Sequence, residues 1–177
     1  MDYFKQDLEN SEAGVQEIAN LLVEHYTKAG HKVVGIKFDK TKAKDLGIRL
    51  SDGRCDDYEI KEDYLHHSTG NLAVEFSCNS KLSGITATKA NYWVFIIHEN
   101  KNLNGVFGCG RIAAVTTVSK LKALLESKSY RKMSGGDGGR AQMYLVPADD
   151  FLEIAFAKIP LSECSIGSER HKRRRYD

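Results

Sequence analysis

The chain lacks a long hydrophobic run and a strong net charge, and both absences narrow what it can be. Its longest apolar stretch, Tyr92–Ile97, is far shorter than the about 20 residues that a helix needs to cross a bilayer. Its first residues are mixed and polar, without the apolar segment of a signal peptide. A net charge of +2 neither requires nor excludes a nucleic-acid partner. We therefore expect no membrane partner and a cytoplasmic location, in a bacterium or a phage-infected host cell.

Clustered cysteines are also absent. The four cysteines are far apart and form no Cys-x-x-Cys pair, whereas structural zinc sites need closely spaced soft ligands. We therefore expect no zinc-stabilised fold, and reduced, partly buried thiols. The cysteines are Cys55, Cys78, Cys109 and Cys164.

The composition is that of one globular domain with a basic end. Of the 177 residues, 41% are hydrophobic and 28% are charged, as in ordinary folded proteins. This length suits a single domain with a substantial buried core. We expect the domain to span residues 1–165. We expect residues 166–177 to form a disordered basic tail, because no apolar pattern accompanies its cations.

Helical and extended patterns alternate along the chain. Residues 11–29 predict a helix, because Ser11 can cap its start, Gly30 can end it and apolar residues recur between them at helical spacing. Further helices are predicted at 118–128 and 149–157, a short helical connection at 85–90 and a polar loop at 63–71. Strands are predicted at 31–38, 45–50, 57–62, 72–77, 92–98 and 143–146.

The segment Tyr92–His98 is the most hydrophobic part of the chain and does not alternate between apolar and polar residues. A strand that is covered on both faces has this pattern, so we place it at the centre of the sheet. The expected fold class is α/β, with a mixed central sheet flanked by helices.

The candidate site lies in a predicted hairpin. Asp45 begins one strand, the turn Ser51–Arg54 follows, and Glu59 and Lys61 lie two residues apart on the next strand. Residues two apart on a strand leave the same face, so Glu59 and Lys61 share a face and the turn could bring Asp45 near them. Two carboxylates and an ammonium at one sheet edge could hold a hard divalent cation and activate water.

Two alternatives stay open at this point. A Glu-x-Lys pattern arises by chance in a chain with this many charges, as a pair on a surface strand. The first acid could also be an aspartate other than Asp45. These aspartates are Asp39, Asp52, Asp56 and Asp57.

An acidic residue on one strand, a turn, and Glu-x-Lys on the next strand, behind an N-terminal helix, resembles the PD-(D/E)XK nuclease superfamily. That superfamily includes many restriction enzymes, Holliday junction resolvases and phage recombination nucleases. The resemblance covers residues 11–99, with Asp45, Glu59 and Lys61 matching the motif, although Lys44 stands where the family often has proline. The segments that follow resemble those of small phage-encoded members. They are 69–71, 74–76, 83–85, 88–90 and 92–95.

The resemblance implies an αβββαβ core and a Mg²⁺-dependent phosphodiester hydrolase that cuts DNA, with Mn²⁺ able to substitute. In that view Asp45, Glu59 and the Ile60 carbonyl hold the metal, and Lys61 orients or helps to deprotonate the attacking water. The resemblance also suggests a homodimer for double-strand cuts. Additional site residues would be Glu75, Glu17, Lys89 and Tyr92.

Cations near the chain end and before the hairpin suggest contacts to DNA phosphates. The tail carries Lys172, Arg173, Arg174 and Arg175, and a second group comprises Lys37, Lys40, Lys42 and Lys44. Two other functions are compatible with the sequence. One is a catalytically inactive nuclease-like scaffold that binds DNA or inhibits a host protein, and the other is a structural or assembly protein.

Overall fold

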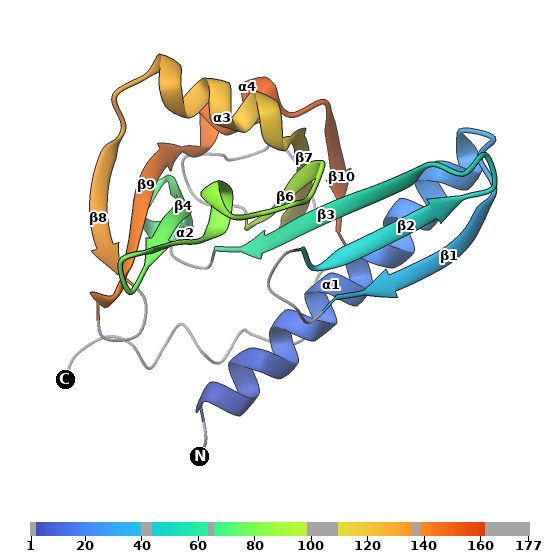
Figure 1. The fold of residues 1–177 in the computed structure, drawn as a ribbon, viewed down its shortest axis with the longest axis horizontal. Coiled ribbons are helices and arrows are strands. Elements are labelled where there is room, and N and C mark those ends of the chain that lie inside the picture. The colour runs from blue at the N-terminus through green and yellow to red at the C-terminus, as the bar shows by residue number, and fades with distance from the viewer. Residues whose placement is uncertain (1–2, 40–43, 64–65, 99–109, 136–138, 162–177) are drawn as a thin grey trace.

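A six-stranded mixed sheet and a four-stranded antiparallel sheet form the fold (Figure 1). The computed structural model describes residues 3–39, 44–63, 66–98, 110–135 and 139–161, with the side chains of 3–12 and 67 left out. The expected α/β class with a mixed central sheet flanked by helices is confirmed. Among the described residues, no helix is long and apolar enough to span a membrane.

The six-stranded sheet has the order β1-β2-β3-β6-β7-β10, and its two central strands, β3 and β6, are its parallel pair. Neighbouring strands elsewhere in this sheet are antiparallel. Residues 93–97 of β6 are buried, which confirms the central position predicted from the lack of alternation. The strands are β1 (Val33–Phe38), β2 (Leu46–Leu50), β3 (Cys55–Glu62), β6 (Tyr92–His98), β7 (Arg111–Thr117) and β10 (Ala157–Pro160).

Helix α1 (Tyr3–Lys28) covers one face of this sheet (Figure 1). Its predicted apolar stripe is confirmed, because Ile18, Leu22 and Tyr26 are buried in one cluster with side chains from β2 and β3. Gly30 ends the helix with φ of +81°, a backbone conformation that glycine adopts without strain. The helix begins at Tyr3 instead of Ser11, since the residues between them include good helix formers and no proline or glycine.

The opposite face packs against a second layer, which contains the four-stranded sheet, three α-helices and a 3-10 helix. Its core combines Trp93 and Phe95 of β6 with Val74, Leu121 and Phe151. The four-stranded sheet has the order β5-β4-β9-β8. The elements of this layer are α2 (His66–Thr69), β4 (Asn71–Cys78), β5 (Lys81–Leu82), η1 (Gly84–Thr86), α3 (Val118–Ser127), β8 (Arg131–Gly135), β9 (Ala141–Pro147) and α4 (Ala148–Ile154).

Several elements differ from the sequence prediction. Strands β5, β7, β8 and β10 were not predicted, the expected loop at 63–71 contains α2, and the connection at 85–90 is reduced to η1. The last helix ends at Ile154 instead of residue 157, because residues from Ala157 onward pair with β7. This pairing joins residues about forty positions apart, such as Ala157 and Val115, so no local pattern could indicate it.

Gly84 has no room for a side chain. Its φ is +50°, and a Cβ there would lie 2.2 Å from the Glu75 carbonyl oxygen. We expect Gly84→Ala to lower the free energy of unfolding by about 1–2 kcal/mol for the backbone conformation and by about 1–3 kcal/mol more for displacing β4. Gly53→Ala is the matched control, since Gly53 also has positive φ, +89°, but open space around it. Equal losses for the two variants in urea unfolding would contradict the packing argument.

Candidate active site

Asp45, Glu59 and Lys61 meet on one face of the six-stranded sheet. The Lys61 Nζ lies 2.6 Å from Glu59 Oε1 and 3.9 Å from Asp45 Oδ2. Asp45 immediately precedes β2, and the other two residues belong to β3, which pairs antiparallel with β2. The hairpin therefore joins two carboxylates and an ammonium in one cluster, called the acidic–lysine cluster below.

The alternation of β3 decides which face carries this cluster. Tyr58 and Ile60 belong to the core beneath α1, so the side chains of Glu59 and Lys61 leave the opposite face. In agreement, Lys61 Nζ lies 6.0 Å from the centre of the Trp93 ring, which belongs to the second layer's core. The cluster thus lies on the face that also carries the four-stranded sheet.

Main-chain contacts fix Asp45 beside β3. Its N–H donates to the Tyr58 carbonyl at 2.9 Å, and its Oδ2 accepts from the Ile60 N–H at 2.7 Å. A residue's N–H and C=O point to the same side of a strand. The Ile60 carbonyl therefore points to the side of β3 on which Asp45 lies.

The charge of Lys61 is stabilised by its acidic neighbours. Burial lowers the pKa of Lys61, but attraction from Glu59 and Asp45, the hydrogen bond to Glu59 and the charge of Glu75 outweigh it, so the net shift is upward. The Lys61 side chain is 39% exposed, so solvent reduces the strength of these interactions. The same attraction makes Glu75 of β4 an electrostatic neighbour of the cluster.

Thr88 is a site residue that the sequence prediction did not include. Its Oγ1 donates to Glu59 Oε2 at 3.1 Å and accepts from the Ala90 N–H at 3.2 Å. Glu59 is thus held by Lys61 on one oxygen and by Thr88 on the other. A threonine two residues after η1 carries no local signal for this role, because the contact joins residues 29 positions apart.

Three of the other candidate aspartates have different side-chain partners, and Asp39 lies next to Asp45. Asp52 accepts from the Arg54 N–H within the turn, and Asp57 pairs with Lys44 at 2.6 Å. Asp56 accepts from the Tyr26 hydroxyl beneath α1. Asp39 donates its N–H to the Asp45 carbonyl. Of the five candidate aspartates, Asp45 is the one whose carboxylate forms an ion pair with Lys61 in the described structure.

Two predicted site residues lie on the opposite face. Glu17 of α1 forms an ion pair with Arg111 at 2.8 Å, and Tyr92 stacks on Tyr58 with ring centres 5.0 Å apart. Glu17 was expected to add a carboxylate to the metal site and Tyr92 to steer phosphate or the DNA strand, and the structure brings neither to the acidic–lysine cluster. Tyr92 lies on this face because it pairs in register with Tyr58, so both rings point toward α1.

Only some of the lysines and arginines predicted to contact DNA lie within the described residues. Lys37 and Lys89 are exposed, and Lys44 is engaged with Asp57. The remaining predicted cations lie outside the described residues, and they are Lys40, Lys42, Lys172, Arg173, Arg174 and Arg175.

The donor atoms of the cluster suit a hard cation. Within the described residues, no group of three or more His, Cys, Asp or Glu side chains is arranged to hold a metal ion. Asp45, Glu59 and the Ile60 carbonyl nevertheless supply oxygen ligands, and Mg²⁺ at phosphate-processing sites is often bound through one or two carboxylates, substrate phosphate and water. The residues present therefore fit Mg²⁺ in that mode.

On the other face of β3, a second polar group joins α1 to the sheet. The Tyr26 hydroxyl donates to Asp56 Oδ2 and lies 2.6 Å from the Tyr58 hydroxyl. Burial raises the pKa of Tyr26 and of Tyr58, and hydrogen bonding to Asp56 and to Tyr26, respectively, adds to the rise. Both phenols therefore stay protonated in the folded protein at pH values where an ordinary tyrosine ionises.

These two raised pKa values predict a loss of stability in alkali. An unfolded tyrosine ionises near pH 10, so above about pH 10 the unfolded state binds fewer protons than the folded state and the free energy of unfolding falls with pH. We expect Tyr26→Phe to make this fall less steep, because one of the tyrosines with a raised pKa is gone. Urea unfolding from pH 7 to 11 measures it, with pH 7 as the reference at which both phenols are protonated. An identical slope in the variant would contradict the expectation.

Comparison of the chain with protein-family models, with curated proteins and with solved structures finds no match. A function for this protein therefore has to be inferred from its sequence pattern and the geometry of its sites.

Proposed function

We propose that the protein is a Mg²⁺-dependent phosphodiester hydrolase acting on DNA, with Asp45, Glu59 and Lys61 as catalytic residues. The observation that carries this proposal is the convergence of two carboxylates and one ammonium from adjoining strands, with Lys61 Nζ within 4 Å of both acids. Paired carboxylates beside a lysine are the arrangement that the PD-(D/E)XK resemblance requires.

The order of elements supports a restriction endonuclease-like core. Helix α1 is followed by the antiparallel strands β1, β2 and β3, and the chain then crosses over to β6, which pairs parallel with β3. This order matches the αβββαβ pattern up to the crossover. The crossover itself departs from the pattern, because α2, β4, β5 and η1 occupy the place of a single helix.

In this proposal Asp45, Glu59 and the Ile60 carbonyl hold Mg²⁺ through oxygen atoms. When bound, such an ion stabilises negative charge on a phosphate and lowers the pKa of a bound water. Thr88 positions Glu59 through the hydrogen bond to Oε2.

Lys61 is proposed to act as an ammonium. Burial lowers its pKa, but the charges of Glu59 and Asp45 outweigh burial, and an ammonium can donate hydrogen bonds that orient water and phosphate oxygens. Glu75 is a candidate additional carboxylate, because its charge acts on Lys61. Lys89 and the basic residues 172–175 are proposed contacts to the DNA backbone.

A non-catalytic scaffold that binds DNA or inhibits a host protein is the second candidate. The observation that favours it is the ion pair itself, since Lys61 already neutralises Glu59 at 2.6 Å and no third metal-capable side chain joins the acids in the described chain. Calorimetric titration with Mn²⁺ separates the two functions. Metal binding that is lost in Glu59→Gln supports the hydrolase, and the absence of binding by the unmodified protein supports the scaffold.

The direct test is plasmid cleavage. We expect the purified full chain to nick or linearise supercoiled DNA with Mg²⁺ or Mn²⁺, and to lose this activity with EDTA or with Asp45→Asn. Asp52→Asn is the matched control, because Asp52 lies in the exposed turn of the same hairpin. Cleavage by folded Asp45→Asn at the rate of the unmodified protein would overturn the proposal.

A further inference from the structure

A cavity of about 190 Å³ opens beneath the C-terminal end of α1, on the face of the sheet opposite the acidic–lysine cluster. Its lining comes from α1, from the start of β3, from β6 and β7, and from β10 with the residue before it. This volume is smaller than the roughly 300–1,000 Å³ of sites for drug-sized ligands. The cavity therefore suits a ligand with a single small ring system at its inner end.

The inner polar atoms of the cavity are hydrogen-bond acceptors. Tyr26 uses its one hydroxyl proton on Asp56, so the bond between the two phenols is donated by Tyr58 to Tyr26. Both phenol protons are therefore already donated, one to Asp56 and one to the Tyr26 oxygen. Asp56, which is 6% exposed and lines the cavity, then offers carboxylate lone pairs to a ligand that brings donors.

Aromatic rings form the walls. Tyr58 and Tyr92 are stacked, with ring centres 5.0 Å apart and planes inclined by 22°. Phe156 meets the Tyr92 ring edge-on at 5.9 Å and is 54% exposed. An exposed phenylalanine beside a small cavity offers a surface on which a flat ring can stack.

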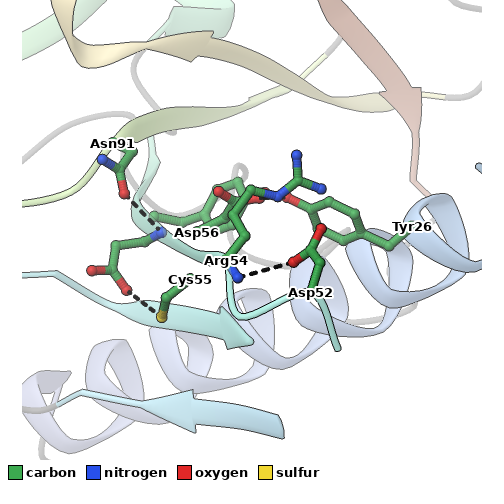
Figure 2. A network of polar contacts seen from close by, with 8 residues as sticks. Tyr26, Asp52, Arg54, Cys55, Asp56 and Asn91 are labelled. Atoms are coloured by element: carbon green, nitrogen blue, oxygen red, sulfur yellow. Dashed lines mark hydrogen bonds and ion pairs between the residues drawn. The ribbon is translucent and has the colours of Figure 1, made fainter. Parts of the chain in front are cut away.

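Basic side chains surround the mouth. The Arg54 guanidinium lies 5.9 Å from the centre of the Tyr26 ring, and its Nε lies 3.5 Å from Asp56 Oδ2. Figure 2 shows Tyr26 projecting from α1 toward Asp56 of β3 and toward Arg54, which immediately precedes β3. His25 and His31, which flank the Tyr26 ring at 6.3 and 6.1 Å, are exposed and also line the cavity. The outer part of a ligand therefore meets groups that bind an anion.

We propose that this cavity binds a nucleotide whose base carries an exocyclic amino group, as cytosine does and thymine does not. The base stacks against the aromatic wall and its amino group donates to Asp56. The phosphate lies at the mouth, near Arg54. This proposal does not rest on DNA cleavage, because the cavity and the acidic–lysine cluster lie on opposite faces of β3.

Isothermal titration calorimetry of the full chain tests the proposal with dCMP and dTMP. Position 4 of the base carries an amino group in cytosine and a carbonyl in thymine; thymine also has a proton on N3 and a methyl group on C5. We expect dCMP to bind at least about tenfold more tightly, because the carbonyl of thymine would face the Asp56 carboxylate without a donor. Equal affinities, or no binding of either nucleotide, would overturn the proposal.

Variants locate the binding to this cavity. Asp56→Asn keeps the side-chain volume and an acceptor for Tyr26, and we expect it to lose the preference for dCMP. Phe156→Ala changes an exposed side chain of the wall, so it should leave the fold intact and lower the affinity for dCMP severalfold. This variant tests the site even if Asp56→Asn fails to fold. Folded Phe156→Ala with unchanged affinity for dCMP would overturn the assignment.

Charge at the mouth is tested by Arg54→Gln, with Arg49→Gln as the matched control in the same hairpin. Arg49 is exposed and pairs in register with Cys55, so its side chain leaves the face opposite Asp56. We expect Arg54→Gln to lower the affinity for dCMP more than the affinity for deoxycytidine, the nucleoside without a phosphate. Arg49→Gln should change neither affinity. Equal weakening of nucleotide and nucleoside would contradict a phosphate at the mouth.

The ligand of the cavity could be a free nucleotide or the end of a DNA strand, and titration separates the two. Tighter binding of dCMP identifies a free nucleotide as the ligand. Tighter binding of a short oligonucleotide with a 5′-phosphorylated cytosine end identifies a strand end. Lys61→Ala should bind dCMP like the unmodified protein even where cleavage is lost. The two proposals can therefore fail separately.

Discussion

Replacing Lys61 by alanine is expected to lower the rate of Mg²⁺-dependent DNA cleavage by about 10²–10³-fold, the usual cost of removing one positioned hydrogen-bond donor that stabilises charge in the transition state. The physical reason is its place between the acids, 2.6 Å from Glu59 and 3.9 Å from Asp45. The measurement is the single-turnover rate of plasmid nicking at saturating Mg²⁺ and with the protein in saturating excess over DNA, where substrate binding does not limit the rate.

Lys158→Ala is the matched control for this experiment. Lys158 is exposed on β10, at the edge of the sheet opposite β1, so the same change of charge and volume is made far from the cluster. We expect it to cleave like the unmodified protein. If folded Lys61→Ala, checked by circular dichroism and thermal unfolding, cleaves at the same rate as Lys158→Ala, Lys61 has no catalytic role.

Replacing Phe151 by alanine is expected to lower the free energy of unfolding by about 3–5 kcal/mol, the usual cost of truncating a buried phenylalanine. Phe151 of α4 is fully buried and packs edge-on against Phe95 of β6, with ring centres 5.0 Å apart. The loss combines the apolar surface returned to water with the cavity left between α4 and the sheet. Urea unfolding followed by tryptophan fluorescence measures it, because Trp93 lies in the same core.

Phe156→Ala provides the control for burial. It removes the same atoms five residues further along the chain, but Phe156 is 54% exposed, and we expect a change within about 0.5 kcal/mol. A loss for Phe151→Ala no larger than that for Phe156→Ala would mean that α4 does not seal the second layer's core as described.

Strand β3 carries a different polar group on each face, and this follows from its alternation. Glu59 and Lys61 lie on the face of the four-stranded sheet, whereas Asp56 and Tyr58 lie beneath α1. One strand therefore supports both the proposed hydrolase cluster and the proposed nucleotide cavity. Lys61→Ala and Asp56→Asn test the two faces independently.

Local patterns correctly indicated the elements around the candidate site. The helix ending near Gly30, the hairpin formed by β2 and β3 and the buried strand β6 each have a periodicity or turn signal within a few residues. Strand β7 was missed because its sequence includes two alanines, which weaken the strand signal, although residues 111–116 are buried. Strand β10 was missed because it depends on pairing with β7.

By itself, the sequence determined that Glu59 and Lys61 share a face, since two residues of one strand are related by backbone geometry alone. The tertiary structure decided that Asp45 contacts Lys61 while Asp57 pairs with Lys44, that Thr88 holds Glu59, and that Glu17 and Tyr92 lie on the other face. These outcomes depend on strand register and on contacts between distant segments. Such contacts form only when the whole chain packs, so no short stretch of sequence encodes them.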